Sequence, residues 1–371
     1  MSEHQTEGGS VQSPEQRRDA LVGRIFGSCI GFMEILSIHV GDRLGFYQAL
    51  VEDDGATASQ LADATVTDER YAREWLEQQA VAGILEVDDA DAQPEERRYR
   101  LPEGHDEVLL ERDSLYYAAP LPQQMVSITR PLPAVLEAFK TGGGVPYSDY
   151  GEDMRDGIAH ANRTMFVNLM GTEWLPTVSD AHERLRADPP ARVADIGCGA
   201  GWSSISIARA YPKVRVDGFD LDEGSIAEAK ANAEAEGLTD RVTFQVRDAA
   251  DPELSGRYDL AIAIECIHDM SRPVEALRAM RSMVDNDGVV LVVDERVGED
   301  FKAPSDETER LMYGFSVLHC LPVGMAEQPS AATGTVMRPA TLRHYATEAG
   351  FSGVEILPID NELWRFYRLV G

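Results

Sequence analysis

A glycine-rich turn between a strand and a helix constrains this chain more than any other stretch. Residues 192–196 form a short apolar run typical of a buried strand, and three glycines follow at every second position: Gly197, Gly199 and Gly201. Residues 203–211 then have the pattern of a helix. Glycine tolerates positive φ and lets a ligand approach bare backbone, and the helix start offers unpaired N–H groups. The turn therefore predicts a nucleotide-type pocket at the carboxyl edge of a parallel sheet.

Two details of this turn bear on which ligand it would take. Its spacing is G-x-G-x-G, whereas the dinucleotide fingerprint is G-x-G-x-x-G. Asp195 also stands two residues before the first glycine, where its charge would repel a pyrophosphate. A ligand with a cationic head group and no phosphate fits better, and S-adenosylmethionine is such a ligand. The alternative is an ordinary glycine-rich strand–helix turn.

Three further strands, each followed by an acid, come after this turn in order. Residues 216–220 end at Asp220, residues 242–246 lead to Asp248, and residues 258–264 lead into Glu265. The stretch from Asp195 to Gly201 resembles the first motif of class I S-adenosylmethionine-dependent methyltransferases, and the later signals match that family's order.

The resemblance implies an α/β fold. We expect a Rossmann-like seven-stranded class I methyltransferase domain preceded by a mostly α winged-helix domain. The sheet should have six parallel strands and a last antiparallel one.

The domain boundaries follow the sequence pattern. We expect a disordered tail over 1–16, an N-terminal helical and winged-helix dimerisation domain over 17–105, and linker helices that cover the active site over 106–185. The S-adenosylmethionine-binding domain should occupy 186–371, with a lid insertion at about 299–338.

The N-terminal domain predicts a homodimer. Apolar residues recur at helical spacing from Arg18 to Leu50, and such a helix is too apolar to stand alone. A short helix capped by Thr57, a helix over 69–82 and a hairpin complete a winged helix. This motif often reads DNA, but its second helix is rich in acids, which argues against DNA binding. The resemblance implies that the winged-helix domain is used for dimerisation.

The acidic composition limits the kinds of partner that the protein can bind. The chain has 64 acidic and 34 basic residues, a net charge of −30, so we expect no nucleic acid and no membrane partner. No window approaches the apolar composition of a membrane span, which favours a cytoplasmic protein. The acidic composition suits a salt-rich, halophilic cytoplasm. The four cysteines are scattered, so no metal site is indicated.

The resemblance and the acids at the strand ends together indicate which residues would bind the cofactor. Asp195 would contact the methionine ammonium of the cofactor directly or through water. The three glycines would let the methionine portion lie close to the backbone. Asp220 would accept hydrogen bonds from the ribose hydroxyls. Asp248 would read the adenine. The remaining candidates at the strand ends are Leu221, Ala249, Glu265 and Cys266. Each acid could instead cap a helix.

His268 and Asp269 resemble the His-Asp pair of plant-type and polyketide O-methyltransferases, in which the histidine is the general base. The usual tryptophan after the pair is Met270 here, so the acceptor class stays open. Asp269 adjoins His268 and could orient it, but neighbouring helical residues do not face each other, so Glu295 is the alternative partner. His268 could instead cap the following helix or pack in the core. The candidates for binding the small-molecule acceptor are Tyr150, Met165, Tyr313 and His319.

We therefore expect an enzyme that methylates a small molecule, with O-methylation preferred. N- or C-methylation by proximity and orientation is the nearest alternative. A cofactor-sensing winged-helix regulator without catalysis, or a cofactor-binding scaffold without turnover, would come from a different class.

Overall fold

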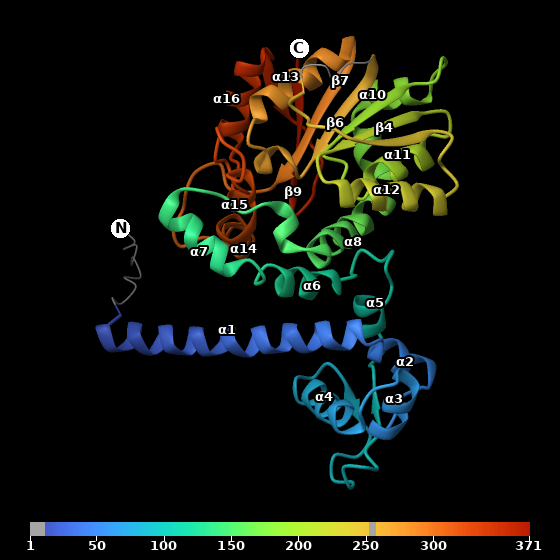
Figure 1. The fold of residues 1–371 in the computed structure, drawn as a ribbon, viewed down its shortest axis with the longest axis vertical. Coiled ribbons are helices and arrows are strands. Elements are labelled where there is room, and N and C mark those ends of the chain that lie inside the picture. The colour runs from blue at the N-terminus through green and yellow to red at the C-terminus, as the bar shows by residue number, and fades with distance from the viewer. Residues whose placement is uncertain (1–11, 252–256) are drawn as a thin grey trace, which may run out of the picture. The chain divides into compact units, whose positions relative to one another are not determined.

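The computed structural model describes residues 12–251 and 257–371. The chain divides into two compact units, Met1–Leu110 and Glu111–Gly371 (Figure 1). Each unit has its own hydrophobic core.

The first unit is mostly helical. Its elements are, in chain order, α1 (Pro14–Arg43), α2 (Phe46–Glu52), α3 (Ala58–Thr65), α4 (Glu69–Val81), β1 (Glu86–Val87), β2 (Tyr99–Arg100) and α5 (His105–Leu109).

These elements form the winged helix that the sequence predicts. Thr57 caps α3 through a capping box with Gln60, and Asp68 caps α4. Strands β1 and β2 pair antiparallel as the wing. Trp75 of α4 packs edge-on against Tyr47 of α2, with ring centroids 5.2 Å apart, and closes the small core of this unit.

Two details of the N-terminal prediction need correction. Helix α1 begins at Pro14, where Ser13 caps it, so the end of the expected tail is helical; residues 1–11 lie outside the described residues. The apolar pattern over 18–50 is two helices and not one, because Gly45 adopts a φ of 69° and separates α1 from α2.

Helix α1 leaves its apolar side chains exposed. Leu21, Val22, Ile25, Phe26 and Met33 are each more than half exposed. The helix is long and apolar enough to cross a membrane by length and composition, with a mean hydropathy of 1.6 in one window of 18 residues. The expectation that no window approaches this composition is wrong for α1. One such helix near the N-terminus is only a weak sign of a membrane, since core helices and signal sequences have the same composition.

The second unit contains helices around one large sheet. Its elements run α6 (Pro120–Ser127), α7 (Leu132–Thr141), η1 (Tyr147–Tyr150), α8 (Glu152–Leu169), η2 (Met170–Trp174), α9 (Leu175–Thr177), α10 (Ser179–Arg186), β3 (Arg192–Ile196), α11 (Trp202–Ala210), β4 (Arg215–Asp220), α12 (Glu223–Ala235) and β5 (Val242–Val246). After these come β6 (Tyr258–Ile264), η3 (Ile267–Asp269), α13 (Pro273–Met283), β7 (Val284–Glu295), α14 (Glu307–Phe315), η4 (Ser316–Cys320), α15 (Leu321–Gly324), α16 (Pro339–Ala349), β8 (Gly353–Ile356) and β9 (Trp364–Val370).

The sheet has the predicted topology. Its strand order is β5-β4-β3-β6-β7-β9-β8. The pairs among β3 to β7 are parallel, and β9 lies antiparallel to both of its neighbours, so six strands share one direction and the last opposes them. The chain builds outward from β3 on one side and then restarts at β6 on the other. The crevice between the ends of β3 and β6 is therefore the topological switch point, where ligands bind in sheets of this kind.

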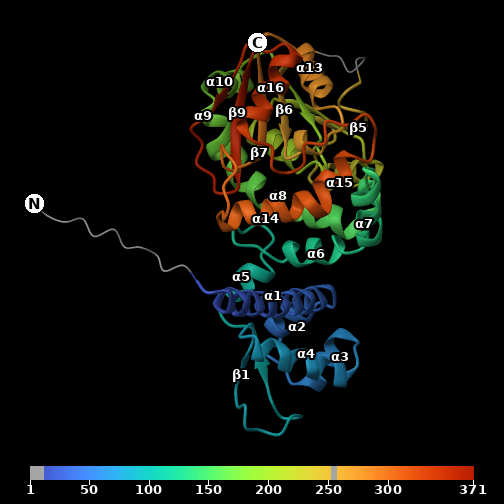
Figure 2. The same ribbon diagram turned by 90° about the vertical axis from the view of Figure 1, so that its left-hand side faces the viewer.

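Helices cover both faces of the sheet (Figure 2). Helices α10, α11 and α12 share one core with one face, and α13 and α16 share a second core with the other. Alternate residues of β7 enter the two cores: Leu291 and Val293 the first, Val290 and Val292 the second.

The predicted insertion between the fifth and sixth strands is present as α14, η4 and α15. Its helical elements follow one another without a break, and the middle one, η4, is a π-helical turn. Such turns occur often at functional sites.

Candidate active site

The glycine turn follows β3 and has the backbone that the sequence predicts. Gly197, Gly199 and Gly201 have φ values of 67°, 50° and 81°, all in the left-handed region. A Cβ at Gly197 would lie 2.6 Å from Cys266, and one at Gly201 would lie 2.5 Å from Phe244. A Cβ at Gly199 would meet nothing within 4 Å. Two glycines are thus needed for packing, while the middle one faces open space that a ligand could fill.

Asp195 lies beneath this turn and is occupied by internal partners. It is 1% exposed, and its Oδ2 accepts hydrogen bonds from the hydroxyls of Ser203 and Ser204 at 2.5 and 2.6 Å. Burial raises the pKa of Asp195 to about 6, although the serine hydrogen bonds oppose that shift. This geometry favours the alternative in which the acid anchors the start of α11.

Asp220 ends β4 and faces the glycine turn. Its Oδ2 accepts the N–H of Gly199 at 2.9 Å, and its Oδ1 accepts the N–H of Asp222 at 2.9 Å. A carboxylate oxygen can accept a second hydrogen bond, so both oxygens remain able to take a hydroxyl. Burial raises the pKa of Asp220. The next residue, Leu221, is 57% exposed.

Asp248 uses its carboxylate in local contacts. Oδ1 accepts the N–H of Ala250 at 2.8 Å, and Oδ2 pairs with the Arg272 guanidinium. Ala249 packs against the core that contains α13 and α16. The geometry gives Asp248 a turn-stabilising role and leaves its contact with adenine a proposal.

Glu265 and Cys266 follow β6 directly across from the glycine turn. The Cys266 thiol donates to the Ile196 carbonyl at 3.2 Å. Glu265 has a φ of 51°, an uncommon conformation for a residue with a side chain. Its Oε1 accepts the indole N–H of Trp364 at 2.6 Å, and its Oε2 accepts from the Asn162 amide of α8. Burial, reinforced by Glu295, raises the pKa of Glu265 to about 8.

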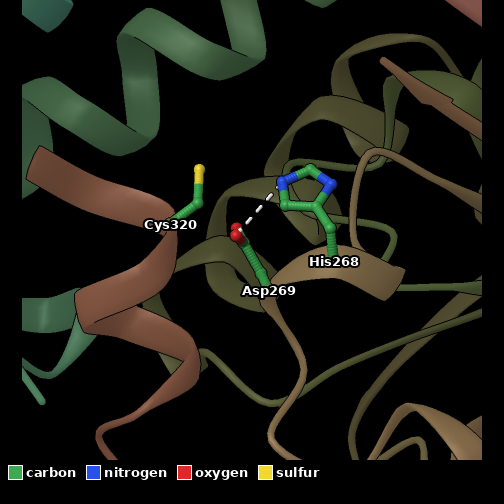
Figure 3. Close-up of side chains that lie close together, drawn as sticks. All are labelled: His268, Asp269 and Cys320. Atoms are coloured by element: carbon green, nitrogen blue, oxygen red, sulfur yellow. Dashed lines mark ion pairs between the residues drawn. The ribbon is translucent and has the colours of Figure 1, made fainter. Parts of the chain in front are cut away.

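His268 stands on the short η3 turn within reach of three carboxylates. Nδ1 donates to Asp294 Oδ1 at 2.9 Å and lies 3.1 Å from Glu295 Oε2. Nε2 lies 3.1 Å from Asp269 Oδ1, and Figure 3 shows this pair with Cys320 beside it. Burial lowers the pKa of His268, but Asp294, Glu295 and Asp269 outweigh it and raise that pKa well above its usual range.

One acceptor oxygen beside His268 has no donor: Asp294 Oδ2 is buried without a hydrogen-bond partner. Glu295 Oε2 and Asp269 Oδ1 each lie 3.1 Å from a ring nitrogen of His268 and have no other hydrogen-bond partner among the described residues. Burial raises the pKa of Glu295 to about 8. The cluster can therefore take a donor group of a ligand, because a buried oxygen without a donor is stabilised by one.

Two of the four acceptor-binding candidates lie together near His268. His319 is 3% exposed, and its ring packs edge-on against Tyr150 at 4.5 Å, between ring centroids. Its Nε2 is buried without a partner, and burial lowers its pKa. The Tyr150 hydroxyl donates to the Leu318 carbonyl at 2.7 Å, so it holds the insertion in place. Two charged neighbours also act on the pKa of His319: Asp269 raises it and His268 lowers it.

The other two candidates have different surroundings. Met165 packs against the core shared with α10 to α12. Tyr313 is 36% exposed, and its hydroxyl accepts from Arg338 at 3.2 Å. No described contact joins either residue to His268.

Three residues of the site lack a sequence prediction. Asp294 is the main partner of His268, and strand alternation could have found it: Val290 and Val292 enter the core beneath η3, so Asp294 points the same way. Asn162 and Trp364 hold Glu265 from 103 and 99 residues away. No local pattern signals contacts over such separations.

Two sets of ligand-type atoms lie within 4.8 Å of one another: His268, Asp269 and Cys320, and His268, Asp294 and Glu295. We assign no metal to either set, since both imidazole nitrogens already face carboxylates.

Comparison with known proteins adds to this geometry. A family model described as a methyltransferase domain matches residues 187–342, and one described as an Rv2258c-like winged helix–turn–helix domain matches residues 33–111. Ajmaline N-methyltransferase of Rauvolfia serpentina is 29% identical over 120 residues, 32% of this chain and 40% of that protein. The chain thus spans less than half the length of this curated relative.

Solved structures resemble nearly the whole chain. Human N-acetylserotonin methyltransferase in complex with S-adenosylmethionine has a TM-score of 0.68 at 18% identity, over 98% of this chain and 99% of its own. An O-methyltransferase family protein from Burkholderia thailandensis has a TM-score of 0.68 at 16% identity, over 97% and 98%. At these identities the likeness shows the fold. With both family models, the sheet topology and the glycine turn, the chain contains a methyltransferase domain with the class I fold and an N-terminal winged-helix domain.

Proposed function

We propose that this protein transfers a methyl group from S-adenosylmethionine to a hydroxyl group of a small molecule, with His268 as general base. The observation that carries the proposal is the Nδ1–Asp294 hydrogen bond of 2.9 Å at the carboxyl end of β6. This bond fixes the ring so that Nε2 faces Asp269.

The residues of the glycine turn fit the cofactor. The open space at Gly199 and the two oxygens of Asp220 would hold its ribose and methionine parts. When bound, the cofactor supplies an electrophilic methyl group. The protein then has to orient the acceptor, exclude water and take the acceptor's proton. His268 is suited to the last task because its base strength is raised by three carboxylates.

A direct test uses purified protein, S-adenosylmethionine and a panel of phenols, alcohols and amines. Formation of a methyl ether supports the proposal. Exclusive formation of N-methyl products would favour the second candidate, N-methylation. That candidate draws support from the acidic surroundings of His268, which suit a basic amine, and from the similarity to an N-methyltransferase.

The pH profile gives a second test. The base must be unprotonated to act, so activity rises as pH passes upward through the pKa of His268. That pKa is raised above its usual 6.5, so we expect the acid limb of kcat/KM above pH 6.5. The variant Asp294→Asn removes one negative neighbour and should move the limb to lower pH. A limb at or below 6.5 in the wild type, unchanged in the variant, would exclude His268.

The winged helix fits dimerisation better than DNA binding. The arginines of α4 are paired with acids: Arg73 with Glu69 and Glu95, and Arg70 with Glu74. A helix that reads DNA needs free basic side chains for the phosphates. We propose that this unit binds no nucleic acid and that the protein is not a regulator.

The exposed apolar residues of α1 lead us to propose a homodimer through the N-terminal unit. We expect twice the monomer mass by light scattering at high salt and micromolar protein. Phe26→Asp, on the apolar face of α1, should give the monomer. Arg24→Asp, away from that face, is the matched control and should leave the dimer intact. A monomeric wild type would contradict the proposal.

We also propose a cytoplasmic protein from a salt-rich cell. All four cysteines are free, and Cys29 is exposed, which suits a reducing compartment. The excess of 30 acidic charges would be screened by salt.

A further inference from the structure

Glu265 occupies the switch point of the sheet. It is the first residue after β6, and the neighbouring Cys266 abuts the glycine turn, where a Cβ at Gly197 would lie 2.6 Å away. The Cys266 thiol also bonds to the last carbonyl of β3, at Ile196. The backbone of 265–266 thus forms the wall of the crevice that faces the glycines.

The conformation of Glu265 is costly and firmly held. A side chain at a φ of 51° is strained, and such residues gather at functional sites. Two N–H donors, from Trp364 on β9 and Asn162 on α8, fix its carboxyl group from opposite elements. Asp54, Val66 and Ala332 also have positive φ, but Glu265 combines this conformation with two side-chain donors beside the glycine turn, which points to a role beyond packing.

Charge around Glu265 is not balanced within the described residues. The ionisable groups that face it are Glu295 from β7 and His268 from η3, while α8 and β9 present the uncharged Asn162 and Trp364. His268 is already shared among three other carboxylates. Asp195, the other acid beneath the turn, is occupied by two serines. Glu265 and Asp220 are therefore acids of the crevice for which the described residues supply no cation of their own, and Asp220 is the one proposed to bind the ribose.

We propose that Glu265 supplies the negative charge that balances a cationic group of the cofactor, its ammonium or its sulfonium. This rests on the proposed function, since the cofactor is S-adenosylmethionine there. Without the cofactor, burial keeps much of Glu265 protonated at neutral pH. A cation beside it favours the carboxylate, so binding releases the Glu265 proton to the solvent.

Calorimetry measures this proton directly. Wild type is titrated with S-adenosylmethionine at pH 7 in phosphate and in Tris, whose ionisation enthalpies differ. We expect release of up to about one proton for each cofactor molecule bound at pH 7. Glu265→Gln should release fewer protons and bind roughly 10- to 100-fold more weakly. Asn162 can rotate its amide to suit the glutamine, and a melting curve checks that the variant is folded.

Asp217→Asn is the control, because Asp217 lies on β4 and its carboxylate pairs with Arg192 and Thr243 away from the glycine turn. It should keep the proton release and the affinity. Titration with S-adenosylhomocysteine, whose sulfur is neutral, separates the two cations: release with both ligands identifies the ammonium, and release with S-adenosylmethionine alone identifies the sulfonium.

Two outcomes would overturn the inference, and they are distinguishable. If the wild type binds S-adenosylmethionine and Glu265→Gln keeps both affinity and proton release, Glu265 has no such role and the proposed function stands. If the wild type does not bind S-adenosylmethionine, the role of Glu265 and the proposed function are both wrong.

Discussion

Replacing His268 with alanine is expected to cut turnover roughly 10²- to 10⁴-fold while leaving S-adenosylmethionine affinity near that of the wild type. The ring stands on η3, which follows β6, whereas the proposed cofactor contacts come from the glycine turn and Asp220. Initial rates and calorimetry on the same preparation separate the two effects.

The alanine variant needs a folding control. His268 is 2% exposed among carboxylates, and removing one partner of a buried ion pair costs about 3–5 kcal/mol. Asp294→Asn keeps the imidazole and a hydrogen-bond acceptor for Nδ1, so it should fold and show a smaller loss of rate with a shifted pH profile. A folded His268→Ala enzyme with full rate at neutral pH would mean that the acceptor needs no base, as for an amine that is already nucleophilic.

Replacing Asp220 with alanine is expected to weaken S-adenosylmethionine binding severely. Each hydrogen bond between a ribose hydroxyl and the carboxylate contributes about 1.5–3 kcal/mol. The change also removes the acceptor of the Gly199 N–H, so the turn itself should loosen. Calorimetry measures the loss.

Asp217→Ala is a suitable control for Asp220→Ala. Asp217 lies on the same strand, but its carboxylate pairs with Arg192 and Thr243 away from the turn. It should keep cofactor affinity. Unchanged affinity in Asp220→Ala would remove Asp220 from the site.

The sequence predicts the parts of this protein that depend on local pattern. Glycines at every second position fix the turn after β3 because each needs a left-handed backbone. Asp220 is predictable from local pattern as well, because it ends the strand next to β3 and its side chain therefore lies beside the glycine turn. The seven strands follow from apolar runs of strand length.

Contacts over long separations are not predictable in this way. Asp195 looks like a ligand by position, yet Ser203 and Ser204 occupy it once α11 begins. The strained φ of Glu265 and its bonds to Asn162 and Trp364 arise only when α8 and β9 come together. Asp294, the hydrogen-bond partner of His268, could be found only from the alternation of side chains along β7, and the sequence-based prediction for this strand names only its neighbour Glu295.

The central claim is methyl transfer from S-adenosylmethionine to a small molecule. The most direct measurement incubates the protein with methyl-labelled S-adenosylmethionine and a protein-free extract of small molecules, and follows the label by mass spectrometry. We predict a labelled small-molecule product, formed together with S-adenosylhomocysteine and reduced by both Asp220→Ala and His268→Ala. Cofactor binding without any labelled product, in extracts of several sources, would contradict the claim.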